Sequence, residues 1–196
     1  MNALGVLSAV HALGADPVRG ALGLAAWSPP EGRGSRWMVD LGPGGIDGRV
    51  QLIDESFNAS PAAMAAALEV FALTRPEDGI GRGSRGRRIA FLADMLELGD
   101  RAEALHADIA RVRALRSVDL IHCAGPMMRA LHAALPPQQQ GQWAPSTQEL
   151  AGQVRRLVDA GDVVLCKGSK GSKVGHIVQA VKDLGQAHPM DEQRAD

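Results

Sequence analysis

The chain has 196 residues, of which 45% are hydrophobic and 22% charged, and its net charge is −1 at pH 7. These values are ordinary for a globular protein, and a charge near zero gives no general attraction to nucleic acid or to an anionic membrane. With three Phe, three Trp and no Tyr, the chain is also short of the aromatic side chains on which single-stranded nucleic acids stack. We therefore expect neither nucleic acid nor a membrane among its partners.

Targeting signals and cysteines point to the cytoplasm. No apolar run reaches the roughly 20 residues that span a bilayer, and no cationic segment followed by a hydrophobic one opens the chain. Cys123 and Cys166 each lie at the end of an apolar run. We expect both to be buried free thiols in a reducing compartment rather than partners in a disulfide. A cytoplasmic location is the resulting prediction.

The first 35 residues predict two short helices followed by a connector. Residues 2–14 carry apolar side chains at helical spacing and end at Gly14, as is typical of a helix C-terminus. Asp16 and Pro17 are a typical N-cap and first-turn pair for a second helix. The segment SPPEGRGS then interrupts helical order with two prolines and two glycines. Because nothing precedes the first helix for it to pack against, we expect both helices to belong to a longer protein.

From residue 36 onward, strand-like and helical segments alternate. We expect strands over residues 36–41, 49–53, 87–93, 118–124 and 162–166, with a doubtful short strand near Trp143. We expect helices over residues 61–73, 101–115, 126–135, 147–160 and 174–184, and a disordered tail over residues 185–196. This alternation predicts an α/β fold with a Rossmann-like, mostly parallel sheet that has helices on both faces.

In such sheets the ligand binds outside the carboxyl ends of the strands, where loops lead into helices. That rule selects four loops, DESFNAS, ADMLELGD, CAGP and CKGSKGSK. The last loop combines glycines, a helix N-terminus and three lysines, which together favour an anion site. The alternative for this loop is a solvated surface segment. It also lacks the Gly-Lys-Ser/Thr ending of a Walker A phosphate loop.

The first of the four loops carries more polar chemistry than a helix start requires. Asp54 and Glu55 are adjacent, so in a strand they point to opposite faces of the sheet. They therefore do not form a paired-carboxylate acid/base couple, although one of them could bind a ribose hydroxyl at the strand end. Asn58 and Ser60 can cap the helix that begins at Pro61. Capping alone does not explain two carboxylates and an asparagine in one turn.

Other polar features favour structural interpretations. The arginine-rich segment over residues 81–88 is more typical of a solvated linker than of a nucleic-acid site. His106 and His122 are interpreted as ordinary core or surface histidines, because no His/Cys/Asp grouping has the spacing of a metal site. The chain contains no Gly-x-Ser-x-Gly or Ser-x-x-Lys motif, so nucleophilic hydrolysis has no support.

Several ordered motifs resemble the C-terminal part of the Mur ligase family. They are SPPEGRGSRW, LIDESFNASPAAMAAALE, GRRIAFLADMLELGD and GDVVLCKGSKGSKV, with Ala93 where glycine is usual. The stretches SFNASP and DMLELG resemble the D-alanyl-D-alanine-adding type. The resemblance implies an ATP-dependent ligase in peptidoglycan precursor synthesis, in which ATP converts a carboxylate into an acyl phosphate and an incoming amine attacks it.

The resemblance also assigns residues to ligands. It implies that Asn2 lies near the adenine, that Arg33 reaches the nucleotide and that Asp54 contacts the ribose, with Glu55 as the alternative. Asn58 and Ser60 would line the same nucleotide edge. The loops ADMLELG and KGSKGSK would face the D-Ala-D-Ala dipeptide. Its candidate contacts are Asp94, Glu97, Lys167, Ser169 and Lys170, the last three for its carboxylate.

Parts of the family pattern do not occur in these 196 residues. The phosphate loop, the Mg²⁺ ligands and the carbamylated lysine of the full-length ligase are not found, so we expect a partial ATP site, no metal site and no catalysis by this chain alone. The expected organisation is a central-domain remnant (residues 1–28), a connector (29–35), a Mur ligase C-terminal domain (36–184) and a tail (185–196). The missing domains could be supplied separately. The alternative is a stand-alone module that binds a nucleotide or an amino acid without catalysis.

Overall fold

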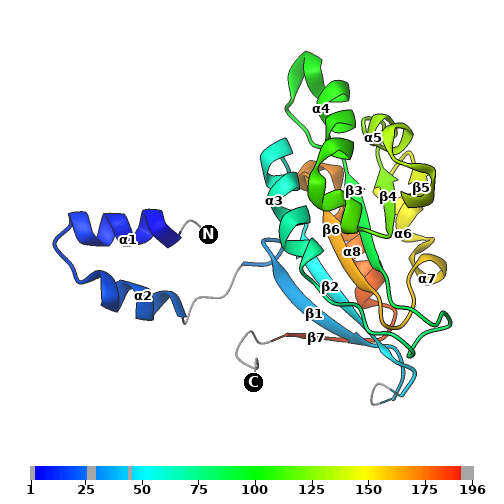
Figure 1. Ribbon diagram of the computed structural model, residues 1–196, viewed down its shortest axis with the longest axis horizontal. Helices are drawn as coiled ribbons and strands as arrows, with labels where there is room; N and C mark the ends of the chain where they lie inside the picture. The colour runs from blue at the N-terminus through cyan, green and yellow to red at the C-terminus, as the bar shows by residue number, and fades with distance from the viewer. Residues whose placement is uncertain (1–2, 26–29, 44–45, 191–196) are drawn as a thin grey trace. The chain divides into compact units, whose positions relative to one another are not determined.

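The computed structural model describes residues 3–25, 30–43 and 46–190. The chain divides into two compact units, residues 1–30 and residues 31–196. Each unit is described by itself, and Figure 1 shows the elements of both.

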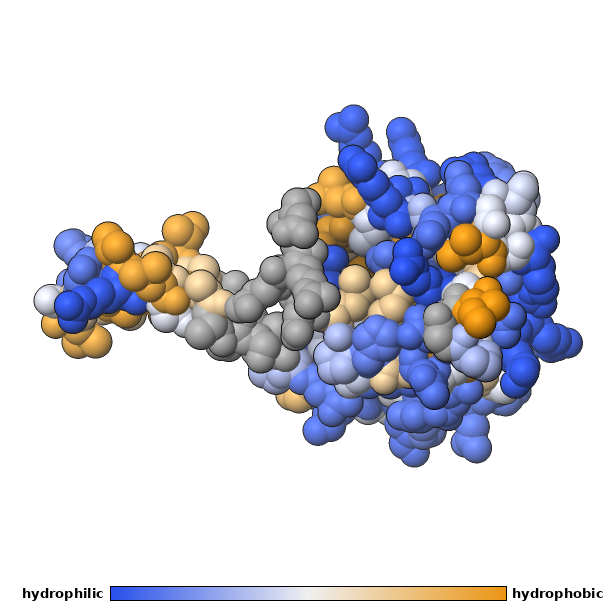
Figure 2. Space-filling view, turned by 90° about the horizontal axis from the view of Figure 1, so that it is seen from below, coloured by the Kyte–Doolittle hydropathy of each residue, from blue (hydrophilic) through white to orange (hydrophobic). Residues whose placement is uncertain are grey.

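The first unit holds two helices, α1 (Ala3–Ala12) and α2 (Pro17–Ala25). Gly14 follows α1 with a φ of 76°, the left-handed conformation that ends many helices. Asp16 caps α2, because its carboxylate accepts a hydrogen bond from the backbone N–H of Val18 at 2.9 Å. Both helix ends therefore agree with the sequence prediction. Figure 2 shows hydrophobic side chains on the surface of this unit.

The second unit is built on one seven-stranded sheet with the order β5-β4-β3-β6-β2-β1-β7. The strands are β1 (Ser35–Asp40), β2 (Arg49–Glu55), β3 (Arg88–Ala93), β4 (Leu120–Ala124), β5 (Gln140–Ala144), β6 (Val163–Lys167) and β7 (Gln186–Pro189). The strands from β5 to β2 are parallel to one another, whereas β1 is antiparallel to both of its neighbours. The predicted α/β fold with a mostly parallel sheet is confirmed.

Helices cover both faces of this sheet (Figure 1). One core lies under α3 (Pro61–Ala72) and α5 (Met128–Ala134), and α4 (Ala102–Asp108) packs against α5. The other lies under α6 (Thr147–Ala151), α7 (Val154–Leu157) and α8 (Gly175–Lys182). Every residue of β6 is buried, as expected for a parallel strand covered on both faces.

Two predicted helices are shorter than expected. The segment predicted over residues 101–115 is helical only in α4 and then continues as 3₁₀ turns on either side of Val112, whose backbone is extended. The segment predicted over residues 147–160 is divided into α6 and α7 at Gly152, and glycine is a weak helix former. The doubtful strand near Trp143 is β5, an edge strand with little apolar sequence.

The predicted disordered tail is wrong over Gln186–Pro189, which form β7. This strand pairs antiparallel with β1, where His188 lies opposite Met38. Its sequence, QAHP, carries no strand periodicity. The pairing uses backbone groups of β1 that would otherwise remain open at a sheet edge. Residues 191–196 lie outside the described part of the chain.

The arginine-rich segment over residues 81–88 has partners within the chain. The Arg87 guanidinium lies 2.7 Å from a carboxylate oxygen of Asp162, which is 1% exposed. The Arg82 guanidinium lies 3.1 Å from Asp159, and Arg88 donates to the carbonyl of Thr74. Arg85 lies 3.7 Å from Asp119. Ion pairing within the fold thus gives this motif a structural explanation.

His122 is a buried core histidine in β4, as one of the two sequence interpretations held. It is 2% exposed, and its ring stacks on that of Phe91 with 4.8 Å between the ring centres. Its Nδ1 accepts a hydrogen bond from Gln142 N at 2.8 Å. Burial, followed by the positive charges of Arg87 and His132, lowers the pKa of His122 from 6.5 to about 4.

Stability should therefore fall as the pH falls from 6.5 towards 4. The unfolded chain takes up a proton on this histidine below about pH 6.5, whereas the folded chain does so only near pH 4, so acid favours unfolding. The expected loss is about 3 kcal/mol. Urea unfolding of the wild type and of His122→Gln between pH 4 and 8 measures it. If the free energy of unfolding changed equally with pH in the two proteins, the lowered pKa of His122 would not be the cause.

Candidate functional site

The four loops selected by the sequence meet at the carboxyl edge of the sheet. The strand register places Glu55 beside Lys167, Lys167 beside Leu92, and Ala93 beside Ala124. The chain runs from β3 through β4 to β5 and then returns to β6 on the other side of β3. This reversal is the topological switch point at which α/β sheets bind ligands. A fifth loop, residues 145–147 after β5, also reaches this edge and was missed by the sequence.

The connector residues Gly32 to Gly34 lie against the loop after β2. The carbonyl of Gly32 accepts a hydrogen bond from Phe57 N at 2.9 Å, and Gly34 N donates to the carbonyl of Asp54 at 2.9 Å. Both glycines have positive φ angles, 76° and 89°, which side chains other than glycine adopt at a cost. The Arg33 guanidinium lies 3.8 Å from the centre of the Phe57 ring. The GRG motif thus holds Arg33 against the loop expected to contact the nucleotide.

The adjacent carboxylates of β2 point to opposite faces, as predicted. Asp54 is 1% exposed, and its carboxylate accepts a hydrogen bond from Ser56 N at 3.0 Å. Glu55 lies 3.3 Å from the ammonium of Lys167. Both carboxylates therefore have partners within the chain. The choice between them as the ribose contact stays a prediction.

Ser60 and Asn58, which are also predicted to line the nucleotide edge, make local hydrogen bonds, and their contact with a nucleotide stays a prediction. Ser60 caps α3, because its hydroxyl accepts a hydrogen bond from Ala63 N at 3.2 Å. Asn58 uses its side-chain oxygen locally, accepting from Ala59 N at 2.8 Å. Asn2 lies outside the described residues.

Lys167 is buried and has partners within the chain. It is 2% exposed, and its ammonium contacts a carboxylate oxygen of Glu55 at 3.3 Å and the carbonyl of Asn58 at 3.0 Å. A buried ammonium needs such partners because its desolvation is costly. In this structure Lys167 joins β6 to the loop after β2, and its expected contact with the dipeptide carboxylate stays a prediction.

Ser169 joins the same loops to the one after β3. Its N–H donates to the carbonyl of Asp94 at 3.1 Å, and its hydroxyl accepts from Leu96 N at 3.0 Å. The hydroxyl also lies 3.5 Å from the carbonyl of Ala59. We call Lys167 and Ser169 the loop hub, because together they fix the loops after β2, β3 and β6. Like Lys167, Ser169 is engaged within the chain, and its expected contact with the dipeptide carboxylate stays a prediction.

Lys170 is exposed and lies near the loop after β2. Its ammonium is 5.5 Å from the centre of the Phe57 ring, the same ring that Arg33 contacts. Two cations therefore lie around one aromatic side chain. The structure places Lys170 with the connector arginine rather than with Asp94.

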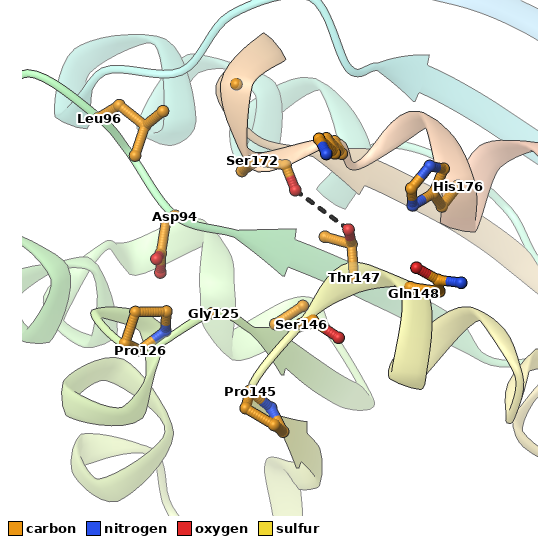
Figure 3. Close-up of a pocket in the computed structure, with 13 residues that line it drawn as sticks. Asp94, Leu96, Gly125, Pro126, Pro145, Ser146, Thr147, Gln148, Ser172 and His176 are labelled. Carbon is orange, nitrogen blue, oxygen red and sulfur yellow. Dashed lines mark hydrogen bonds between the residues drawn. The ribbon is translucent and has the colours of Figure 1, made fainter.

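A pocket of about 300 Å³ lies at the other side of the edge (Figure 3). The loops after β3, β4, β5 and β6 and the start of α8 form it, and its polar wall includes Asp94, Ser146, Thr147, Lys173 and His176. We call it the edge pocket. Of these residues, only Asp94 was predicted as a contact. Lys173 lies in a loop that the sequence selected, whereas the weak strand signal of β5 concealed Ser146 and Thr147.

Asp94 forms the buried carboxylate of the edge pocket. It is 6% exposed, and one carboxylate oxygen accepts a hydrogen bond from Met128 N at 2.9 Å. Burial raises the pKa of Asp94, and hydrogen bonds from the backbone of Met128 and Met127 and the charge of His106 oppose this rise. Glu97, also a predicted contact, is exposed with a φ of 63° and does not line the pocket.

The described residues contain no group of three or more His, Cys, Asp or Glu side chains that could hold a metal ion. Within the same ranges, no helix is both long enough and apolar enough to cross a membrane.

The mostly parallel sheet and its switch point define an α/β domain of the doubly wound class. A family model described as the glutamate ligase domain of Mur ligases matches residues 44–170. The chain therefore belongs to the Mur ligase family.

Relatives in sequence are the UDP-N-acetylmuramoyl-tripeptide–D-alanyl-D-alanine ligases of three bacteria. The Bacillus subtilis enzyme is 29% identical over 94% of this chain and 37% of the relative. The Rickettsia prowazekii enzyme is 26% identical over 90% of this chain and 36% of the relative. The Escherichia coli enzyme is 26% identical over 68% of this chain and 27% of the relative. The chain thus spans about a third of the length of the first two relatives and about a quarter of the third.

Solved structures share the fold. MurF from Acinetobacter baumannii has a TM-score of 0.71 at 20% identity, and the match covers 93% of this chain and 36% of that one. MurF from Thermotoga maritima, solved in complex with ADP, has a TM-score of 0.65 at 22% identity, covering 91% of this chain and 36% of that one.

Proposed function

We propose that this chain is the C-terminal portion of an ATP-dependent amide ligase that adds D-alanyl-D-alanine to UDP-N-acetylmuramoyl-tripeptide in peptidoglycan precursor synthesis. In this proposal it supplies the ribose and adenine edge of the ATP site and the binding site for D-Ala-D-Ala. The observation that carries it is the meeting of the connector and four loops at one sheet edge in a Mur ligase domain. The names of the relatives supply the substrates.

The proposed nucleotide edge consists of Arg33, Phe57 and Lys170. A guanidinium and an ammonium next to one ring suit the oxygen atoms and the base of a nucleotide. The solved complex of a structural neighbour with ADP supports a nucleotide as the ligand. Asp54 is the proposed ribose contact, with Glu55 as the alternative. Asn2 remains the proposed adenine contact.

ATP supplies the phosphoryl group that activates the carboxylate of the other substrate, and Mg²⁺ in a full-length ligase would offset the phosphate charge. The described residues offer no donor cluster that fits Mg²⁺. The proposed role of this chain is therefore to bind and orient the nucleotide and the dipeptide. The connector and the loop after β2 hold the nucleotide edge, and the loop hub keeps that edge in register with the loops around the edge pocket. The proposed setting is cytoplasmic, with the remaining ligase domains as partners.

Because the 196 residues contain no Gly-Lys-Ser/Thr phosphate loop, we expect no ligation by the purified chain. Incubation with ATP, Mg²⁺, UDP-N-acetylmuramoyl-tripeptide and D-Ala-D-Ala should give no dipeptide-dependent ADP, while the B. subtilis ligase assayed in parallel does. Dipeptide-dependent ADP release from this chain would contradict the expectation.

Binding tests the other half of the proposal. Titration with ADP should shift the backbone amide signals of Arg33, Phe57 and Lys170, and Phe57→Leu should weaken that response. Shifts confined to residues away from the carboxyl edge would refute the nucleotide assignment.

A further inference from the structure

A second pocket, of about 280 Å³, lies between α3 and the sheet. Figure 1 shows α3 alongside β2 and β6, and residues of these three elements line the pocket. It begins at Glu55, at the end of β2, and continues to Val70 and Phe71 in the last turn of α3. We call it the α3 pocket. It shares no lining residue with the edge pocket and is therefore a separate cavity.

The strand register explains the floor of the α3 pocket. In the parallel pairing of β2 with β6, Ile53 lies beside Leu165 and Glu55 lies beside Lys167. Side chains two positions apart in a strand point to the same face of a sheet, so both pairs face α3. The floor is therefore apolar along most of its length and charged at the end nearest the carboxyl edge.

The wall formed by α3 is apolar and has small side chains. Ala63, Ala66 and Ala67 line the pocket, and Val70, which is 51% exposed, continues the same wall. Longer side chains at the three alanine positions would fill the space between the helix and the sheet. A mostly apolar pocket with a few polar groups at one point is the usual form of a small-molecule site.

The polar end of the α3 pocket is an ion pair. The ammonium of Lys167 lies 3.3 Å from a carboxylate oxygen of Glu55, whose side chain is 30% exposed. An ammonium has three N–H donors, and within the described part of the chain Glu55 and Asn58 accept two of them. A ligand group that both accepts and donates hydrogen bonds therefore suits this end. A carboxylate on the ligand would be repelled by Glu55 and an ammonium by Lys167, which favours a neutral group.

We infer that the α3 pocket binds a small neutral molecule with an apolar body and one amide or hydroxyl group. The polar group lies at Glu55 and Lys167, and the apolar body lies against Ile53 and the alanines of α3. Lys167 also binds the carbonyl of Asn58 at 3.0 Å, so the bound molecule stabilises the loop after β2 and, with it, the nucleotide edge. This effect on the nucleotide edge rests on the proposed function, whereas binding in the pocket does not.

Benzamide is the probe, because it combines an apolar ring with a primary amide. NMR titration of the purified chain should shift the backbone amide signals of Ala66, Val70 and Lys167, with a Kd of about 1 mM. Toluene has the ring without the amide, and benzoate has a charge in its place. Each should bind about fivefold more weakly than benzamide, because a hydrogen bond is lost or a like charge is met.

Two variants and a matched control test the position of the ligand. Ala66→Leu fills the pocket from an exposed position of α3 and should weaken benzamide binding about tenfold. Ala62→Leu makes the same change at an exposed position of α3 that does not line the pocket, and it should leave binding unchanged. Lys167→Met removes the N–H donor and should lower the affinity for benzamide to that for toluene. Urea unfolding establishes that each variant is folded.

Equal effects of Ala66→Leu and Ala62→Leu, or benzoate binding as tightly as benzamide, would overturn the inference. Shifts of the same amide signals when the chain is concentrated without benzamide would also overturn it, because they would assign this surface to a second copy of the chain. Amide hydrogen exchange of residues 56–60 should slow in the presence of benzamide, and unchanged exchange would refute the effect on the nucleotide edge. ADP should still shift Arg33 and Phe57 in Ala66→Leu, so failure of the α3 pocket is distinguishable from failure of the proposed function.

Discussion

Replacing Asp162 by alanine is expected to lower the free energy of unfolding by about 3 kcal/mol, because the backbone N–H groups of Arg87 and Asp159 would lose their buried acceptor. The Asp162 carboxylate accepts hydrogen bonds from the backbone N–H groups of Arg87 and Asp159 and two from the Arg87 guanidinium, all between 2.7 and 3.1 Å. The bond to Asp162 is also the largest cause of the raised pKa of Arg87. Without the Asp162 carboxylate, the start of β3 and the arginine-rich segment over residues 81–88 would both lose hydrogen bonds that hold them in place.

Urea unfolding of the wild type and of Asp162→Ala measures the effect. Glu77→Ala is the matched control, because Glu77 pairs with Arg49 at 2.9 Å while both side chains are largely exposed, at 43% and 53%. Exposed pairs contribute about 0–1 kcal/mol. Similar decreases in the free energy of unfolding for the two variants would show that Asp162 does not stabilise the start of β3.

At the loop hub, Glu55→Ala is expected to destabilise the chain more than Lys167→Met. Glu55→Ala leaves the Lys167 ammonium, which is 2% exposed, with the Asn58 carbonyl as its hydrogen-bond partner, and the free energy of unfolding is expected to fall by about 3 kcal/mol. Lys167→Met removes the charge and keeps much of the side-chain volume, while Glu55, whose side chain is 30% exposed, can be hydrated. The expected loss for this variant is about 1 kcal/mol.

The double variant Glu55→Ala/Lys167→Met separates lost contacts from buried charge. It should be more stable than Glu55→Ala alone, because no unpaired ammonium remains. Urea unfolding gives the three free energies, and amide hydrogen exchange of residues 56–60 reports whether the loop after β2 opens. A double variant less stable than either single variant would contradict the proposed role of the ion pair.

Local sequence patterns correctly predicted helix ends and the burial of the two cysteines, because these features depend on neighbouring residues. Ser60 caps α3, and Gly14 ends α1. Cys123 and Cys166 are buried free thiols. Each of these features is governed by interactions within a few residues or by simple hydrophobicity.

The sequence was less informative where a residue depends on a distant partner. The strand β7 has no strand pattern, because pairing with β1 rather than side-chain preference determines it. The strand β5 is an edge strand with a weak signal, and the loop behind it was therefore missed. Lys167 looks like a free loop cation in the sequence, yet Glu55 and Asn58, more than 100 residues away in the chain, bind it.

By itself, the sequence determined the α/β alternation, the parallel sheet and the loops that reach its carboxyl edge, because period and turn chemistry are local. The tertiary structure decided which charged side chains of those loops are buried and which are exposed. It buried Lys167 and Ser169 in the loop hub, placed Lys170 near the Phe57 ring that Arg33 also contacts, and left Lys173 in the wall of the edge pocket. Lys167, Ser169, Lys170 and Lys173 all lie within the seven residues 167–173. Their roles differ because burial and the nearest opposite charge are set by strands that come together only when the sheet forms.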